Sequence, residues 1–112
     1  MTAATQKLRF WIDMALECVR RDHTPQLSPG DQKGPFLTAR ALGMALAALN
    51  DANAYASSRS PLLNLPATPG LVPTPGNPVD SDIASAAACA QVLRLRYPNQ
   101  ANLLEPAWLH WL

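Results

Sequence analysis

The two histidines are where a search for chemistry starts, because imidazole titrates near neutral pH and is a common metal ligand. His23 and His110 lie far apart in the sequence, and neither has a carboxylate or cysteine at the spacing of a metal site. We expect His23, in 20-RRDHTP-25, to be a loop residue that hydrogen-bonds locally. We expect His110, which stands between two tryptophans, to pack within a helix.

Asp13 and Glu17 are the nearest approach to a pair of carboxylates for acid–base catalysis. Arg9, Arg20 and Arg21 alternate with them at helical spacing. Opposite charges three or four residues apart stabilise a helix surface, so the pattern predicts a solvated ladder of ion pairs.

Asn50 and Asp51 interrupt an apolar helical segment. A buried carboxylate must be paired, which indicates Arg40 or an unseen cation as the partner of Asp51. Cys18 and Cys89 lie in apolar helical patterns and are interpreted as buried free thiols, with a disulfide as the open alternative. The chain has no phosphate-binding glycine loop and no nucleophile elbow. On residue types alone, no catalytic, cofactor-binding or metal-binding residue is assigned.

Composition narrows the class of protein. The 112 residues suffice for one domain, 48% of them are hydrophobic, and the net charge of +1 comes without a basic patch that would favour nucleic acid. The apolar run 41-ALGMALAAL-49 is short for a membrane span, which needs about 20 residues. The N-terminus has no secretory pattern. We therefore expect a protein of the cytoplasm with no membrane contact.

Hydrophobic periodicity and proline placement predict an all-α fold with about four helices, over residues 5–21, 35–57, 81–97, and from residue 99 or 100 onward. Because residues 41–49 include no polar side chain, this stretch is predicted to be buried on all sides, as in the central helix of a bundle. The Pro-rich loop 60–78 is predicted either to lie extended over the surface through its leucines or to be a disordered linker.

The last two helices have distinct apolar stripes. The third is predicted to bury a face whose members are Ile83, Ala87, Ala90, Leu93 and Tyr97. The fourth has Leu104, Ala107 or Trp108, and Trp111 on one stripe, and 105-EPAWLHWL-112 carries no capping residue. Such a surface needs a partner, so we expect either further chain or another subunit to pack on the Trp108/Trp111 face.

Three segments taken together, 10-FWIDMALECVRRDHTP-25, 34-GPFLTARALGMALAALNDANAYA-56 and 82-DIASAAACAQVLRLRYPNQ-100, carry a family resemblance. Their order resembles the N-terminal helical region of bacterial vanadium-dependent haloperoxidases, which are relatives of the type 2 phosphatidic-acid phosphatases. The resemblance implies that residues 1–112 are the N-terminal helical segment of a larger helical bundle. The full protein would bind vanadate and oxidise halide with hydrogen peroxide.

The chain departs from the family pattern where the chemistry would be. Leu46 stands where members often have a histidine, and no Pro-Ser-Gly-His motif is present. Ser58-Arg59 has no matching distal histidine, and the spacing of Lys33 and Arg40 mimics the first site motif only by coincidence. The resemblance thus implies a non-catalytic scaffold segment without its own cofactor. The alternatives are the same segment of an acid-phosphatase-like relative and a stand-alone helical interaction module, each with a possible homo-oligomer.

Overall fold

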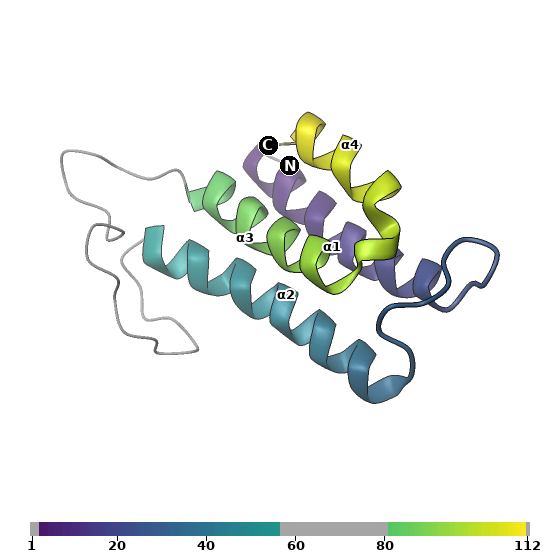
Figure 1. Ribbon diagram of the computed structural model, residues 1–112. Helices are drawn as coiled ribbons and strands as arrows, with labels where there is room; N and C mark the ends of the chain where they lie inside the picture. The colour runs from purple at the N-terminus through teal and green to yellow at the C-terminus, as the bar shows by residue number, and fades with distance from the viewer. Residues whose placement is uncertain (1–2, 57–80, 112) are drawn as a thin grey trace.

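The structure is a computed structural model of the chain and describes residues 3–56 and 81–111, with the side chains of residues 6–56 and 81–110. Four α-helices are present in these ranges, α1 (Ala3–Asp22), α2 (Pro35–Ala56), α3 (Ser81–Arg96) and α4 (Ala101–Trp111), with a 3-10 turn η1 (Pro98–Gln100) before α4. The predicted all-α fold is confirmed (Figure 1). The predicted loop 60–78 and Ser58-Arg59 lie outside the described residues.

The helix ends follow local chemistry. Pro35 is the first residue of α2, a position where the missing N–H costs nothing, and Gly34 before it has a φ of 87° that favours glycine. Pro98 ends α3 at Arg96 and starts η1, so the last helix begins at Ala101, one or two residues later than predicted. The first helix begins two residues earlier than predicted, at Ala3.

The central helix is α3, against which α1, α2 and α4 all pack (Figure 1). Its buried residues are small or medium in size: Ser85, Ala86, Cys89, Ala90 and Leu93. Small side chains let neighbouring helix axes approach closely, which allows three helices to share one short helix as their support. Ile83, predicted on the buried face, is exposed in the first turn of α3.

One core joins the four helices. Its largest fully buried side chains are Trp11 of α1, Leu93 of α3, Leu104 of α4, and Tyr97, which lies between α3 and η1. Full burial of a large apolar side chain is worth roughly 1.5–3 kcal/mol, so these residues supply much of the driving force for closing the bundle. None of the described helices is long and apolar enough to cross a lipid bilayer.

The prediction that residues 41–49 are buried on all sides is wrong. Met44 is 40% exposed and Leu46 is 37% exposed, and Phe36, earlier in α2, is 89% exposed. Only alanines of α2 are fully buried, among them Ala41 and Ala45, because α2 meets α3 through its alanine side. Leu42 and Leu49 are partly buried against the core, whereas Phe36, Leu37, Met44 and Leu46 are left on the outside of the bundle.

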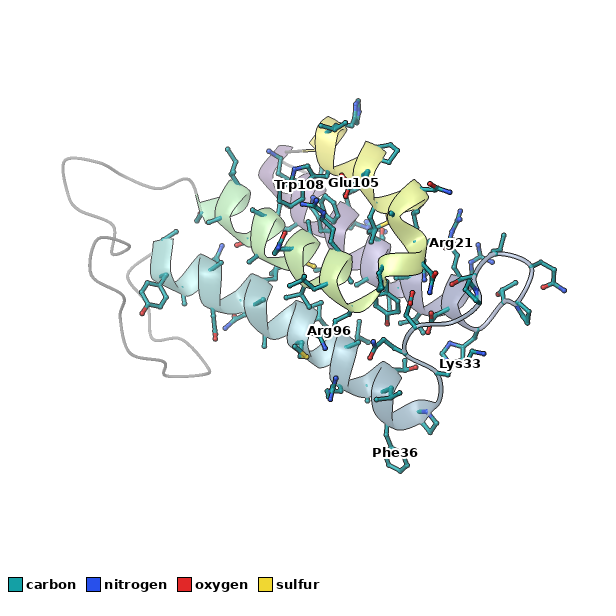
Figure 2. All side chains as sticks on the ribbon, in the orientation of Figure 1. Arg21, Lys33, Phe36, Arg96, Glu105 and Trp108 are labelled. Atoms are coloured by element: carbon teal, nitrogen blue, oxygen red, sulfur yellow. The ribbon has the colours of Figure 1, made fainter. Side chains whose placement is uncertain are left out.

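A cation–π contact between Arg94 of α3 and Trp108 of α4 helps to hold these two helices together. The guanidinium carbon of Arg94 lies 4.8 Å from the centroid of the Trp108 ring, and its Nε is 3.0 Å from Oε1 of Glu105 (Figure 2). Trp108 therefore packs against the chain's own core and is half-buried. Leu109 is 81% exposed. His110, in the last turn of α4, is also exposed and is not part of the buried core, and its role in helix packing stays a prediction.

Candidate functional site

A set of polar side chains gathers where the end of α1, the α1–α2 connection and the α3–η1 corner meet. We call this set the polar junction, and its members are Asp22, Asp31, Gln32, Arg96, Tyr97, Asn99 and Gln100. It includes buried polar groups and is therefore the first place to look for chemistry in the described part of the chain.

Asp22, the last residue of α1, is at the centre of the junction. Its side chain is only 2% exposed, and its two oxygens accept the backbone N–H groups of Asp31 at 2.5 Å and Gln32 at 2.8 Å. A buried carboxylate is costly unless hydrogen bonds satisfy it, and two amide donors meet that need. The carboxylate is thus occupied in shaping the α1–α2 connection.

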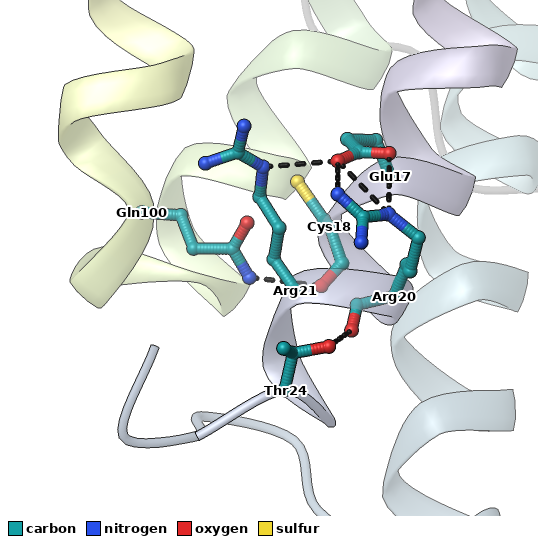
Figure 3. Close-up of polar contacts among 6 residues, drawn as sticks. All are labelled: Glu17, Cys18, Arg20, Arg21, Thr24 and Gln100. Carbon is teal, nitrogen blue, oxygen red and sulfur yellow. Dashed lines mark hydrogen bonds and ion pairs between the residues drawn. The ribbon is translucent and has the colours of Figure 1, made fainter. Parts of the chain in front are cut away.

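Side-chain amides tie this connection to the far end of the sequence. Asn99 donates from its backbone N–H and from Nδ2 to Asp31, at 3.1 and 2.6 Å. Nε2 of Gln32 donates to the carbonyl of Arg96 at 3.0 Å. Nε2 of Gln100 donates to the carbonyl of Cys18 at 2.8 Å (Figure 3). These bonds hold the corner before α4 in place.

Tyr97 is the buried titratable group of the junction. Burial raises the pKa of its phenol to about 12, with a smaller contribution from the nearby negative charges of Asp22 and Asp31. At neutral pH the hydroxyl therefore keeps its proton and is a poor general base. Its oxygen, like Oε1 of Gln32 and Oε1 of Gln100, has no hydrogen-bond partner within the described residues.

A shallow open hollow of about 230 Å³ borders the junction. It is lined by Asp22, His23, Pro25, Ser28, Pro29 and Lys33. The imidazole of His23 is held locally: Nδ1 lies 2.9 Å from the carbonyl of Val19 and Nε2 lies 3.5 Å from Oγ1 of Thr38. The prediction that His23 hydrogen-bonds locally is confirmed. Because Asp22 and His23 are both engaged with their own chain, the hollow presents Lys33 as its one exposed charged side chain.

The predicted ladder of ion pairs is confirmed on α1. Arg20 and Arg21 both bind Glu17, with Arg20 Nε 3.0 Å from Oε2 and Arg21 Nε 3.0 Å from Oε1 (Figure 3). The hydrogen bond from Arg20 holds the pKa of Glu17 at about 2, and in return Glu17 raises the pKa of Arg20. Arg9 lies 3.8 Å from Asp13. Glu17 is thus ionised at any physiological pH and cannot act as a general acid.

The two cysteines are buried and free, as predicted. Burial raises the pKa of each thiol to about 12, and for Cys18 the neighbouring Cys89 adds to the shift. The Sγ of Cys89 lies 3.8 Å from the carbonyl oxygen of Trp11 and donates a weak hydrogen bond to it. A thiolate is the reactive form, so neither residue is a nucleophile in the folded chain.

The predicted pairing of Asp51 with Arg40 is wrong within the chain. Both residues lie on α2 and are eleven positions apart, which is about 16 Å along the helix axis. Asp51 is half-buried, and its Oδ1 lies 3.4 Å from Nδ2 of Asn50. Lys33 lines the hollow and Arg40 does not, so the two cations do not converge on one anion site.

Metal chemistry has no candidate ligands in the described ranges. Among residues 3–56 and 81–111, no three of the His, Cys, Asp and Glu side chains gather closely enough to hold a metal ion.

The polar junction was not predicted from the sequence, because the pair Asp31 and Asn99 is 68 positions apart and leaves no local pattern. Its one sequence signal is the set of turn-forming residues in 22–34.

The sequence and the fold were compared with protein-family models, with curated proteins and with solved structures, and none of these matches the chain. The polar groups of the described residues therefore have to be interpreted from their own geometry. These groups stabilise the fold. The carboxylate of Asp22 accepts backbone N–H groups, the amide of Gln32 connects two distant segments, and the two thiols are buried in the core.

Proposed function

We propose that this chain is a non-catalytic helical scaffold that packs on another protein surface. The observation that carries the proposal is the contrast between its polar and apolar side chains. The polar groups of the junction bond mainly to the chain itself, and Asp22, Tyr97 and Gln100 are buried, whereas each helix leaves a large apolar side chain outside: Leu16 on α1, Phe36 on α2, Leu95 on α3 and Leu109 on α4. Single exposed leucines are ordinary, but Phe36 and Leu109 keep 89% and 81% of their surface exposed and would gain by burial.

The family resemblance supports a finer form of the proposal. Its three segments overlap α1, α2 and α3, the helices that form the core around Trp11 and Leu93, and the third segment continues through η1. In this form the chain is the N-terminal scaffold of a vanadium-dependent haloperoxidase-like protein. Vanadate would be held by residues outside residues 1–112, and the full protein would oxidise halide with hydrogen peroxide. Phosphate-ester hydrolysis is the alternative chemistry of the same superfamily.

A stand-alone interaction module is the second candidate, and one observation favours it. The four helices close a core in which Trp11, Tyr97 and Leu104 are fully buried without help from another chain. A module of this kind would use the Trp108/Trp111 face or another exposed surface to bind its partner. For either form we propose a location in the cytoplasm, supported by the two free thiols, because disulfides persist in oxidising compartments.

The test of the finer form uses the complete product of the gene. Vanadate-dependent bromination in that product, without phosphatase turnover, would support the haloperoxidase form, and the reverse result would support the phosphatase form. A product that binds neither vanadate nor phosphate would contradict both and leave the interaction module. The 112-residue chain serves as the control and is expected to show no saturable vanadate binding.

A further inference from the structure

Positively charged side chains without an ion pair gather at one end of the bundle. Within residues 3–56 and 81–111, Lys7, Lys33, Arg40 and Arg96 bind no carboxylate, whereas the other arginines in these ranges each do. Lys7 is near the start of α1. The other three belong to the end of the molecule where α2 begins and α3 ends (Figure 2). Gln32 joins these two segments, because its side chain donates to the carbonyl of Arg96.

Exposed apolar side chains lie beside these charges. Leu37, Arg40 and Met44 are three or four residues apart, so they share one side of α2, and Leu37 and Met44 are 42% and 40% exposed. Leu95, next to Arg96 in the last turn of α3, is 61% exposed. We call these residues the basic–apolar face. Its apolar side chains would gain by burial, so the face is a candidate contact surface.

Both helices present these residues on the side of the bundle away from α1. Ala41 and Ala45 mark the side of α2 that packs on α3. Thr38 stands on the α1 flank of these alanines, because its hydroxyl lies 3.5 Å from Nε2 of His23 at the end of α1. The α2 members of the face stand on the other flank. Since α1, α2 and α4 surround the remaining sides of α3, Leu95 lies on the side that they leave open (Figure 1).

Charge complementarity selects the partner of the basic–apolar face. The face includes two cations and no acidic side chain. Every acidic side chain within residues 3–56 and 81–111 is already engaged with the chain itself, in ion pairs, with amides or in other contacts. A second copy would therefore offer no free carboxylate from these ranges. The negative charges that the face favours come from a different protein.

The arrangement also favours a protein helix over other anions. Lys33 and Arg40 do not line one hollow, so the unpaired cations suit separate carboxylates better than a single phosphate group. Three cations are fewer than the roughly four to eight that mark an anionic lipid surface, and the net charge is only +1. Exposed leucine and methionine beside arginine fit the apolar side of an amphipathic helix whose flanks are acidic.

We propose that the basic–apolar face binds an amphipathic helix of another protein, with an apolar side flanked by Asp or Glu. The proposal rests on the proposed scaffold function and names the class of partner for one surface of the scaffold. Arg40 and Arg96 bind the carboxylates, and Leu37, Met44 and Leu95 cover the apolar side. Nε of Arg96 has no hydrogen-bond partner within the described residues, so its guanidinium is not committed to the chain itself.

A synthetic peptide tests the charge and the location together. The probe is an amphipathic helical peptide of about 18 residues, with leucine along one side and glutamate on both flanks. Its control has lysine in place of glutamate. In calorimetric titrations the glutamate peptide should bind the 112-residue chain saturably, more weakly as salt is added, and the lysine peptide should not bind. In amide NMR spectra, the largest shifts caused by the glutamate peptide should fall on the basic–apolar face.

Matched variants separate this face from the rest of the surface. Arg40→Glu and Arg96→Glu should each weaken peptide binding by about tenfold, whereas Lys7→Glu, the same charge change on α1, should leave it unchanged. Leu95→Gln should weaken binding by about fivefold or more. Leu16→Gln, at a position on α1 that is 52% exposed, should not. Arg40 is exposed, so Arg40→Glu remains decisive if Arg96→Glu lowers helicity in circular dichroism.

Three outcomes would overturn the proposal. They are no saturable binding of the glutamate peptide, equal binding of the lysine peptide, and NMR shifts that fall mainly on another surface. Binding to phosphatidylserine vesicles without binding to the glutamate peptide would also overturn it and assign the face to an anionic lipid surface. The scaffold function is decided separately, by Leu109→Gln on α4, so failure of the one is distinguishable from failure of the other.

Discussion

The carboxylate of Asp22 accepts the backbone N–H of Asp31 at 2.5 Å, and this contact sets the course of the chain between α1 and α2. Its second oxygen binds the N–H of Gln32. Asp31 in turn receives two hydrogen bonds from Asn99, so the end of α1 is connected through one short loop to η1, the turn before α4. The polar junction is therefore a structural link between the two halves of the sequence.

Replacing Asp22 is expected to destabilise the fold strongly. Asp22→Ala leaves two buried amides without their acceptor, and an unsatisfied buried group costs about 1–3 kcal/mol. We expect the free energy of unfolding in urea to fall by about 2–3 kcal/mol. Asp13→Ala is the matched control, since Asp13 is exposed and its ion pair with Arg9 is worth less than about 1 kcal/mol. Equal effects of the two substitutions would show that Asp22 has no special role.

The contact between Arg94 and Trp108 predicts how firmly α4 is held. Arg94→Ala removes the cation above the indole ring and the ion pair with Glu105, and we expect a loss of about 1–2 kcal/mol in urea unfolding. Arg94→Lys keeps the charge but not the planar group, so it should lose less. An unchanged stability for Arg94→Ala would mean that apolar packing, through residues such as Leu104 and Ala107, holds α4 without this contact.

The buried thiols predict a loss of stability in alkali. The folded pKa of about 12 for Cys18 and Cys89 is above their ordinary value of 9.0. The unfolded chain therefore releases protons first, so stability is full below about pH 9 and falls as the pH rises toward 12. The slope is about 1.4 kcal/mol per pH unit for each thiol. Urea unfolding at several pH values should show this fall, and Cys89→Ala should reduce its slope. A flat profile between pH 9 and 11 would contradict the burial of the thiols.

Glu17 predicts a titration at the acid end. Its folded pKa of about 2 is below its ordinary 4.5, so its ion pairs contribute stability above pH 4.5 that is lost as the pH falls toward 2. In a carbon NMR titration the Glu17 carboxylate should change near pH 2, and in Arg20→Ala the midpoint should move back toward 4.5. Added salt should also raise the pKa of Glu17 toward 4.5, because salt screens an ion pair that is largely exposed. A midpoint near 4.5 in the unaltered chain would refute the bonding of Arg20 to Glu17.

Local signals in the sequence predicted the elements but not how they face one another. Pro35, Pro98 and the charges at helical spacing on α1 mark their structures directly, because each acts on neighbours within a turn or two. Residues 41–49 have no polar side to orient the helix, so the sequence left open that Met44 would be outside and Ala45 inside. In the fold, the fully buried residues of α2 are alanines, and the exposed ones include the larger Phe36 and Met44.

The candidate site could be predicted only in its local part. The sequence predicts that His23 hydrogen-bonds locally, and its partner Val19 lies one helical turn away. The bond of Gln100 to Cys18 joins positions 82 residues apart, and only the folded bundle brings them together. The cation–π contact between Arg94 and Trp108 likewise forms only because the chain turns at Pro98 and brings α4 back against α3.

The measurement that tests the scaffold most directly compares one substitution in two settings. Leu109→Gln changes an exposed apolar side chain of α4 to a polar one of similar helix propensity. In the 112-residue chain it should alter the free energy of unfolding by less than about 0.5 kcal/mol. In the complete product of the gene, where another protein surface would cover Leu109, it should cost roughly 1.5–3 kcal/mol. The same small effect in both settings would contradict the account, because Leu109 would then face solvent and support nothing.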